Sequence, residues 1–135
     1  MTHYVEVLIV DDQPRARQSV RALLSTWPPA AEIREAGDGR EAIQLIQERQ
    51  PDIVLMDVRM PEMDGLQATR LIKARWPQIK VIVLTLYGEY EPEALAAGAD
   101  AFIGKGERPD RLLAELLPLA PEQPLQTGLN LCSER

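Results

Sequence analysis

The stretch Ile53-Val54-Leu55-Met56-Asp57 decides the fold, because four apolar residues in a row are followed at once by an acid. A continuous apolar run of this length is typical of a parallel strand that is buried on both faces. Val7-Leu8-Ile9-Val10 repeats the pattern and is followed by Asp11 and Asp12. If both runs are parallel strands, their carboxyl ends meet at one edge of a sheet, and the three acids share one crevice.

Amphipathic stretches alternate with short apolar runs along most of the chain. We predict strands at Val5–Val10, Ala31–Glu35, Ile53–Met56, Val81–Leu84 and Ala101–Ile103. We predict helices at Pro14–Trp27, Arg40–Arg49, Leu66–Arg75, Glu91–Ala97 and Asp110–Leu117. Asp38 and Asp64 stand where helix N-caps are expected, and Gly98 suits the left-handed end of the fourth helix. Five strands alternating with five helices predict an α/β fold with a doubly wound, mostly parallel five-stranded sheet.

Length and composition predict a single acidic globular domain. The chain has 135 residues, a net charge of -6 and one cysteine. An internal disulfide is therefore impossible, and we do not expect this acidic domain to bind DNA by itself. Neither a signal-peptide pattern nor an apolar run long enough to span a membrane is present, and we expect a cytoplasmic protein. The alternating pattern stops near Pro118. We therefore expect a domain over residues 4–118 and a tail or linker over residues 119–135.

The polar residues after the strands suit phosphoryl chemistry. Thr85 follows the run Ile79 to Leu84, which only Lys80 interrupts, and Lys105 follows the run Ala101 to Gly104. Clustered carboxylates repel one another, and a bound Mg²⁺, which prefers oxygen ligands, removes that penalty. The cation would hold Asp57 ionised as a nucleophile toward phosphorus, which would give an aspartyl phosphate. The lysine and the threonine would then contact phosphoryl oxygens.

Each of these residues also has a simpler interpretation when it is taken alone. Asp11-Asp12 could be a helix N-cap with a solvated neighbour, and Asp57 could be a turn residue at the end of a strand. Thr85 is an ordinary strand residue type, and Lys105 is an ordinary surface charge. The joint placement of all five polar positions at strand ends favours a site over these separate interpretations.

The motifs of the chain together resemble the receiver domain of bacterial two-component response regulators. The resemblance covers Tyr4 to Leu117 and is most specific from Pro51 to Gly65, around Asp57. Its other carriers are Val7 to Asp12, Ala36 to Ala42, Val83 to Thr85 and Gly98 to Lys105. The details around Asp57 and Gly98 resemble the subgroup whose members usually carry a C-terminal helix-turn-helix domain.

The resemblance implies a flavodoxin-like (βα)5 fold and a role for each site residue. Asp57 would accept a phosphoryl group from the phosphohistidine of a sensor histidine kinase. Asp12 and Asp57 would bind Mg²⁺ directly, the Arg59 backbone carbonyl would be a third protein ligand, and Asp11 would act mainly through water. Thr85 and Lys105 would bind the phosphoryl group. Inward movement of Thr85 would let Phe102 rotate and change the surface of the fourth helix, fifth strand and fifth helix.

Several positions depart from the common receiver pattern or flank the site. Phe102 lacks the hydroxyl of the commoner tyrosine, so the switch would work by packing alone. Leu86 is bulkier than the small residue often found after the threonine. Arg59 and Tyr87, each two residues beyond a site residue, flank the expected water path, and we expect them to slow autodephosphorylation. The alternative is that both are solvated surface side chains.

The same residues also bear on other functions and on assembly. A phosphohydrolase would have a second acid two residues after the nucleophile, but Arg59 stands there and cannot act as general acid or base. A receiver-like interaction domain that ignores phosphorylation is the remaining alternative. The last predicted helix is rich in leucine, which leaves homodimerisation through the switch surface open, although core burial is the simpler interpretation. We expect contact with DNA only through an output domain, and the residues after Pro118 show no helix-turn-helix pattern.

Overall fold

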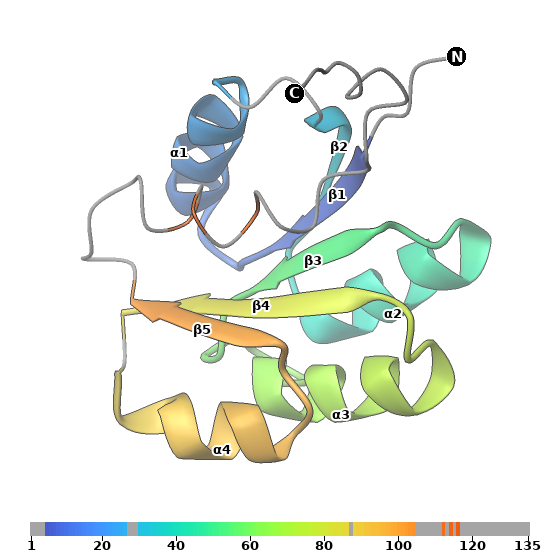
Figure 1. Cartoon of the computed structure of the whole chain (residues 1–135), viewed down its shortest axis with the longest axis vertical. Helices are drawn as coiled ribbons and strands as arrows, with labels where there is room; N and C mark the ends of the chain where they lie inside the picture. Colours follow the sequence, from blue (N-terminus) through green and yellow to red (C-terminus); the bar gives the residue numbers. More distant parts are fainter. Residues whose placement is uncertain are drawn as a thin grey trace, which may run out of the picture.

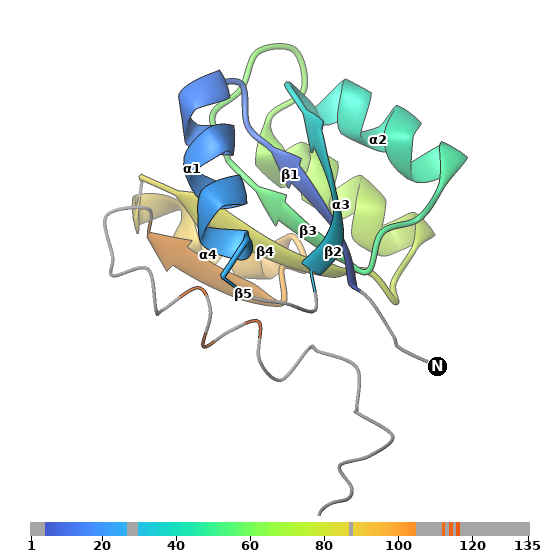
Figure 2. The same ribbon diagram turned by 90° about the horizontal axis from the view of Figure 1, so that it is seen from above.

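The computed structural model describes residues 5–26, 30–86 and 88–104, together with residues 112, 114 and 116. Its strands all belong to one sheet: β1 (Val5–Val10), β2 (Ala30–Ala36), β3 (Ile53–Met56), β4 (Lys80–Thr85) and β5 (Ala101–Gly104). The strand order is β2-β1-β3-β4-β5, and every neighbouring pair is parallel. The five arrows accordingly point toward the same edge of the sheet (Figure 2). The predicted parallel, doubly wound sheet is therefore confirmed.

Helices cover both faces of this sheet. They are α1 (Pro14–Leu24), α2 (Gly39–Glu48), α3 (Gly65–Arg75), the 3₁₀ turn η1 (Gly88–Tyr90) and α4 (Glu91–Ala96). Figure 1 shows α1 on one side of the sheet and α2, α3 and α4 on the other. Of the predicted fifth helix, only Leu112, Ala114 and Leu116 are described, and all three are helical. Among the described helices, none is long and apolar enough to cross a membrane.

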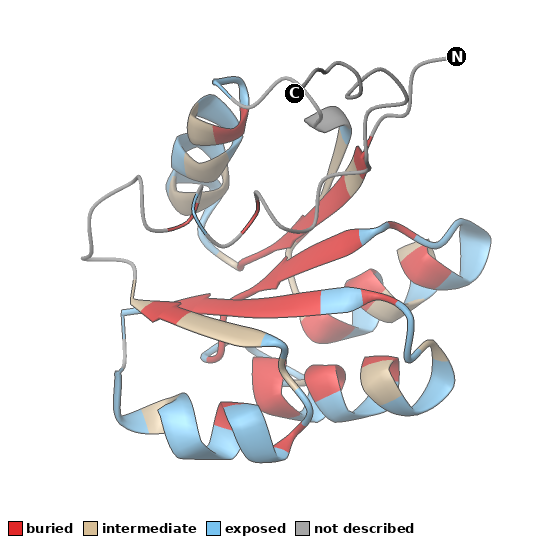
Figure 3. Cartoon of the chain, viewed as in Figure 1, coloured by how far each residue is buried: buried red, intermediate tan, exposed pale blue. Residues whose placement is uncertain are grey.

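Alternate residues of β1 and β3 contribute to two apolar cores, one on each face of the sheet. Val7 and Ile9 of β1 pack on the α1 side with Leu24, whereas Leu8 and Val10 pack on the side of α2 and α3. The two sets lie on opposite faces because a strand turns successive side chains to opposite sides. Both sets are buried. Figure 3 shows the central strands buried along most of their length. The continuous apolar runs in the sequence are explained by this two-sided burial.

The helix ends follow local hydrogen bonding. The Asp38 side chain accepts a hydrogen bond from the Glu41 amide at the start of α2, and the Asp64 side chain accepts one from the Gln67 amide at the start of α3. Gly98, just after α4, has a φ of 103°. Both predicted N-caps and the predicted left-handed glycine are therefore confirmed.

Helix α1 is shorter than the predicted range to Trp27. It ends at Leu24, and the hydroxyls of Ser25 and Thr26 then donate hydrogen bonds to the carbonyls of Ala22 and Leu23. These short side chains compete with the helix for its terminal carbonyl groups, which favours termination. Trp27 lies outside the described residues.

An ion-pair cluster ties α1 to β2. One Glu35 oxygen lies 2.8 Å from Arg17 Nε, and the other lies 2.7 Å from Arg21 Nε. Partial burial alone would raise the pKa of Glu35, but the hydrogen bonds and charges of Arg21 and Arg17 outweigh it and lower that pKa from its ordinary value of 4.5. A carboxylate with a depressed folded-state pKa stabilises the fold above its ordinary pKa and loses that contribution as the pH falls through the folded value.

The ion-pair cluster predicts that Glu35→Gln lowers the free energy of unfolding by an amount that depends on pH. At about pH 6 the variant should have a lower free energy of unfolding than the wild type, because one anion between two guanidinium groups is lost. The difference should shrink as the pH falls below the ordinary pKa of 4.5 and through the lowered folded-state pKa, because Glu35 then becomes protonated in the wild type as well. Urea unfolding of both proteins across this range measures the difference. A cost that stayed constant with pH would contradict the assigned ion pairs.

Candidate functional site

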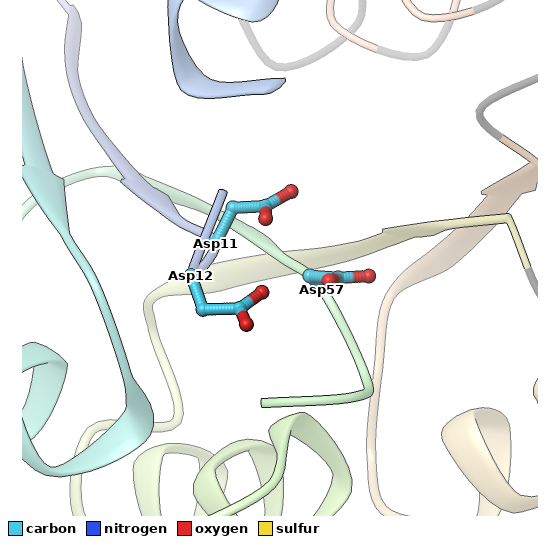
Figure 4. A group of neighbouring side chains, drawn as sticks. All are labelled: Asp11, Asp12 and Asp57. Carbon is cyan, nitrogen blue, oxygen red and sulfur yellow. The ribbon is translucent and has the colours of Figure 1, made fainter. Parts of the chain in front are cut away.

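Three carboxylates converge at the carboxyl edge of the sheet. Asp11 and Asp12 follow β1, Asp57 follows β3, and one oxygen of each lies within 4.8 Å of the others. Figure 4 shows the three side chains directed into the same space. Asp11 and Asp57 are buried, and Asp12 is partly buried. The sequence prediction that these acids meet at one edge of the sheet is confirmed.

The register of β1 and β3 causes this convergence. Val10 of β1 is the register partner of Met56 of β3, so both strands end at the same level. The Asp57 amide then donates a hydrogen bond of 2.9 Å to the Val10 carbonyl, which continues the ladder one step beyond the strands. The two acids that follow β1 and the one that follows β3 are thereby fixed side by side.

Asp11 is held through its backbone and its side chain. Its amide donates to the Ala36 carbonyl of β2 (3.1 Å), and its Oδ1 accepts from the Gln13 amide (2.9 Å). Its carbonyl accepts a hydrogen bond of 2.6 Å from Arg17 Nη1. The N-cap of α1 is Gln13, without a side-chain cap, and Pro14 occupies the first turn. The interpretation of Asp11-Asp12 as the N-cap is therefore wrong, and both carboxylates are directed toward Asp57 instead.

The loop after Asp57 is shaped by two glycines. A Cβ on Gly65 would lie 1.8 Å from the Asp57 carbonyl oxygen, and a Cβ on Gly39 would lie 2.8 Å from the Met63 carbonyl oxygen. The Gly65 amide donates to the Val58 carbonyl (2.7 Å). Absence of a side chain at residue 65 therefore lets α3 start directly against the residue that bears the predicted nucleophile.

The same loop contains a residue with unusual backbone geometry. Glu62 has a φ of 67°, the left-handed region that side chains other than glycine seldom adopt. Pro61 and Glu62 are both exposed, so the turn projects from the edge of the sheet. The turn at Glu62 and the close approach of Gly65 to Asp57 together give this loop its shape.

Thr85 and Phe102 lie on adjoining strands beyond the acids. Thr85 is the last residue of β4 and is fully buried, and its register partner is Gly104 of β5. Two residues earlier, Val83 is the partner of Phe102, so Val83 and Thr85 share one face of the sheet. Phe102 is half-buried and packs on an apolar cluster of Val58, Leu66, Val83 and Ala94. This cluster connects the residue after Asp57 to α4.

The remaining predicted site residues are exposed or lie outside the described residues. Arg59 is exposed, and Leu86 is 67% exposed. Lys105 and Tyr87 fall outside the described ranges. Lys105 directly follows Gly104, the register partner of Thr85, in the chain.

Sequence reasoning overlooked the basic and small residues that support the acids. Arg17 reaches the Asp11 carbonyl from α1, and Gly39 contacts the loop after Asp57 from the start of α2. The spacing of Arg17 and Arg21, four residues apart on one helix face, was a usable signal once Glu35 was placed on the next strand. No sequence pattern alone identifies the carbonyl that Arg17 contacts.

The sequence family of response regulator receiver domains matches residues 7–117 of the chain. The chain belongs to the response regulator receiver domain family. Receiver domains are phosphorylation-switched signalling modules of two-component systems rather than enzymes of the usual kind, which agrees with the sequence interpretation and gives no support to a phosphorylation-independent domain.

Curated relatives of this receiver domain are named as regulators. It is 36% identical over 127 residues to an uncharacterized transcriptional regulatory protein, YhcZ of Bacillus subtilis, covering 93% of this chain and 59% of the relative. It is 42% identical over 103 residues to the response regulator protein VraR of Staphylococcus aureus, covering 75% of this chain and 49% of that protein. The receiver domain thus spans about half the length of the curated relatives it matches.

Solved structures confirm the fold. A LuxR-family two-component response regulator from Aurantimonas is similar with a TM-score of 0.81 and 30% identity, covering 87% of this chain and 85% of that one. The chemotaxis protein CheY4 of Vibrio cholerae is similar with a TM-score of 0.76 and 30% identity, and the match covers 86% of this chain and 98% of that one.

The close approach of Gly65 to Asp57 predicts a severe effect of Gly65→Ala. A methyl group 1.8 Å from the Asp57 carbonyl oxygen cannot be accommodated, so the start of α3 or Asp57 itself must shift. We expect a loss of about 1–3 kcal/mol in the free energy of unfolding, measured with urea. The matched control is Gly88→Ala, since a Cβ there has nothing within 4 Å. Equal stability of the two variants would contradict the described packing.

Proposed function

We propose that this receiver domain accepts a phosphoryl group on Asp57 from the phosphohistidine of a sensor histidine kinase, with Mg²⁺ as cofactor. The observation that carries the proposal is the convergence of three carboxylate oxygens within 4.8 Å at the carboxyl edge of a parallel sheet. Acids this close, of which two are buried and one is partly buried, repel one another unless a cation joins them. Hard oxygen donors are the ligand type that Mg²⁺ prefers.

The proposed ligand set consists of Asp12, Asp57 and the backbone carbonyl of Arg59, with Asp11 acting mainly through water. When bound, Mg²⁺ would neutralise charge on the carboxylates and on the incoming phosphoryl oxygens. Asp11 is fixed by its hydrogen bonds to β2, Gln13 and Arg17, and its carboxylate is thereby oriented toward the other two. The donor set fits a hard divalent cation.

The phosphoryl transfer follows from these positions. An Asp57 carboxylate oxygen would attack the phosphorus of the donor phosphohistidine, a new P–O bond would form, and the P–N bond would break. The electron pair of that bond would remain on the leaving imidazole nitrogen of the kinase. The Thr85 hydroxyl and the Lys105 ammonium would contact oxygens of the bound phosphoryl group. Positioning and electrostatics, rather than acid–base catalysis, are the main contributions expected of the protein.

The switch would run from Thr85 to Phe102. Movement of the Thr85 hydroxyl toward the phosphoryl group would withdraw it from the sheet face that it shares with Val83, beside Phe102. Phe102 could then rotate inward against Val58 and Ala94, the residues that already surround it. Because Ala94 belongs to α4, the packing of this helix would change with the ring. Phosphorylation would thus shift a population between two packed states.

The proposed output is a changed surface over α4, β5 and the predicted fifth helix. Leu95 on α4 is 49% exposed, so this surface already carries an apolar side chain that a partner or a second copy could cover. That surface would control a partner protein, dimerisation or an output domain. The similar regulators are named as transcriptional, and any contact of this protein with DNA would run through such an output domain.

The kinase donor also implies a cytoplasmic location, because histidine kinases use cytoplasmic ATP.

The proposed boundaries are a receiver domain over residues 4–118 and a tail or linker over residues 119–135. The family match over residues 7–117 supports the proposed bounds of the receiver domain.

The phosphoacceptor is tested by comparing the wild type with Asp57→Asn. Incubation with Mg²⁺ and acetyl phosphate should add one phosphoryl group to the wild type, seen by intact mass, and none to the variant. The amide keeps the shape of the side chain but lacks the nucleophilic carboxylate. Asp52→Asn, which changes an exposed acid at the opposite end of β3, is the control and should still be labelled. Equal labelling of Asp57→Asn would refute the assignment.

The flanking residues Arg59 and Tyr87 should slow loss of the phosphoryl group. The double variant Arg59→Ala, Tyr87→Ala removes two large side chains from the expected path of the attacking water, so its phosphoryl group should be lost faster. The rate is measured by phosphate release after the donor is removed. Arg70→Ala, an exposed change on α3, should leave the rate unchanged. Slower loss in the double variant than in the wild type would overturn this role.

A further inference from the structure

Arg17 occupies a bridging position between three elements. It belongs to α1, its Nε lies 2.8 Å from Glu35 of β2, and its Nη1 donates a hydrogen bond of 2.6 Å to the Asp11 carbonyl after β1. Its side chain is only 19% exposed, although it carries a full charge. The planar guanidinium group lets one side chain satisfy two acceptors on different elements at once, which a lysine cannot do with the same geometry.

We infer that Arg17 is a positioning residue that fixes the Asp11-Asp12 segment in its cation-binding conformation. The inference rests on the proposed Mg²⁺ site and adds a residue that is not itself a ligand. The Asp11 backbone is held from both sides, since its amide donates to Ala36 of β2 and its carbonyl accepts from Arg17. Asp12 follows directly, so the direction of its carboxylate depends on how firmly the Asp11 carbonyl is fixed.

Glu35 in turn fixes Arg17. Its two oxygens are divided between Arg17 and Arg21, which stand one helical turn apart on α1. Gly37, just after β2, leaves ordinary van der Waals space beside Arg17, since a Cβ there would lie 3.8 Å from Nη1. The guanidinium group is therefore oriented by an anion on one strand while it restrains the loop after the neighbouring strand. Residues that contact the ligands of a metal, without contacting the metal themselves, commonly fix the orientation of those ligands.

A purely electrostatic role and a positioning role of Arg17 predict opposite changes in Mg²⁺ affinity when the residue is removed. A cation beside an acidic crevice opposes the entry of Mg²⁺, so removing its charge would strengthen metal binding if charge were all that mattered. Positioning predicts that removing Arg17 weakens binding, because the Asp11-Asp12 segment is released. The sign of the change therefore separates the two roles.

Arg21 provides a matched control within the same cluster. It is on the same helix and pairs with the other oxygen of Glu35, but its second contact is the Ile33 carbonyl within β2 (3.2 Å) and not the Asp11 carbonyl. Arg17→Ala and Arg21→Ala each remove one positive charge and one ion pair to Glu35. Only the first removes a hydrogen bond to the segment that bears the acids.

The test measures Mg²⁺ affinity by calorimetry for the wild type, Arg17→Ala, Arg17→Lys and Arg21→Ala. We expect Arg17→Ala to weaken binding by about tenfold, with Arg21→Ala close to the wild type. Arg17→Lys keeps the charge and the apolar stem and should fold even if the alanine variant does not. It should weaken binding by a smaller factor, since it cannot reproduce both contacts. Unchanged or tighter binding in the two Arg17 variants would overturn the inference.

Amide hydrogen exchange in the metal-free proteins gives an independent readout. Exchange of the Asp11 and Gln13 amides should be faster in Arg17→Ala and Arg17→Lys than in Arg21→Ala, because only Arg17 contacts the segment between them. If the wild type itself bound no Mg²⁺, the proposed cofactor would be wrong, while the exchange data would still decide whether Arg17 fixes the segment. Equal exchange in Arg17 and Arg21 variants would contradict the positioning role.

Discussion

Repulsion between three carboxylates at one edge of the sheet is the constraint on which this structure depends. The parallel register of β1 and β3 brings Asp11, Asp12 and Asp57 within 4.8 Å of one another, and two of the three are buried. Such an arrangement costs folding free energy unless a cation is present. The sheet behind it is correspondingly apolar on both faces, and that burial provides the favourable free energy that offsets the repulsion at its edge.

The residues around the acids limit how far repulsion can separate them. Arg17 and Ala36 hold the Asp11 backbone, the Val10 carbonyl accepts a hydrogen bond from the Asp57 amide, and Gly65 lets α3 begin directly against Asp57. These contacts come from elements on both faces of the sheet. A rigid support of this kind would keep the site arranged before a cation or a phosphoryl group arrives, and would leave movement to Thr85 and Phe102.

The sequence predicted the architecture well because two-sided burial leaves a direct mark on composition. Runs such as Ile53–Met56 match the observed strand bounds, and Asp38 and Asp64 are N-caps as expected. The acidic cluster was predictable because parallel strands end at one edge. The end of α1 was not, because hydroxyl groups of Ser25 and Thr26 terminated the helix early. The Arg17 contact was also not predictable, since it depends on the angle between α1 and β2 rather than on any local pattern.

The most direct test of the central constraint is the free energy of unfolding of the wild type and Asp12→Asn, each with and without Mg²⁺. Without Mg²⁺, the variant should be the more stable protein, because one of three mutually repelling charges is removed. Saturating Mg²⁺ should stabilise the wild type strongly and the variant little, since ligand binding to the folded state adds stability according to its affinity. A variant that is less stable than the wild type without Mg²⁺ and gains as much from the cation would contradict a shared cation site.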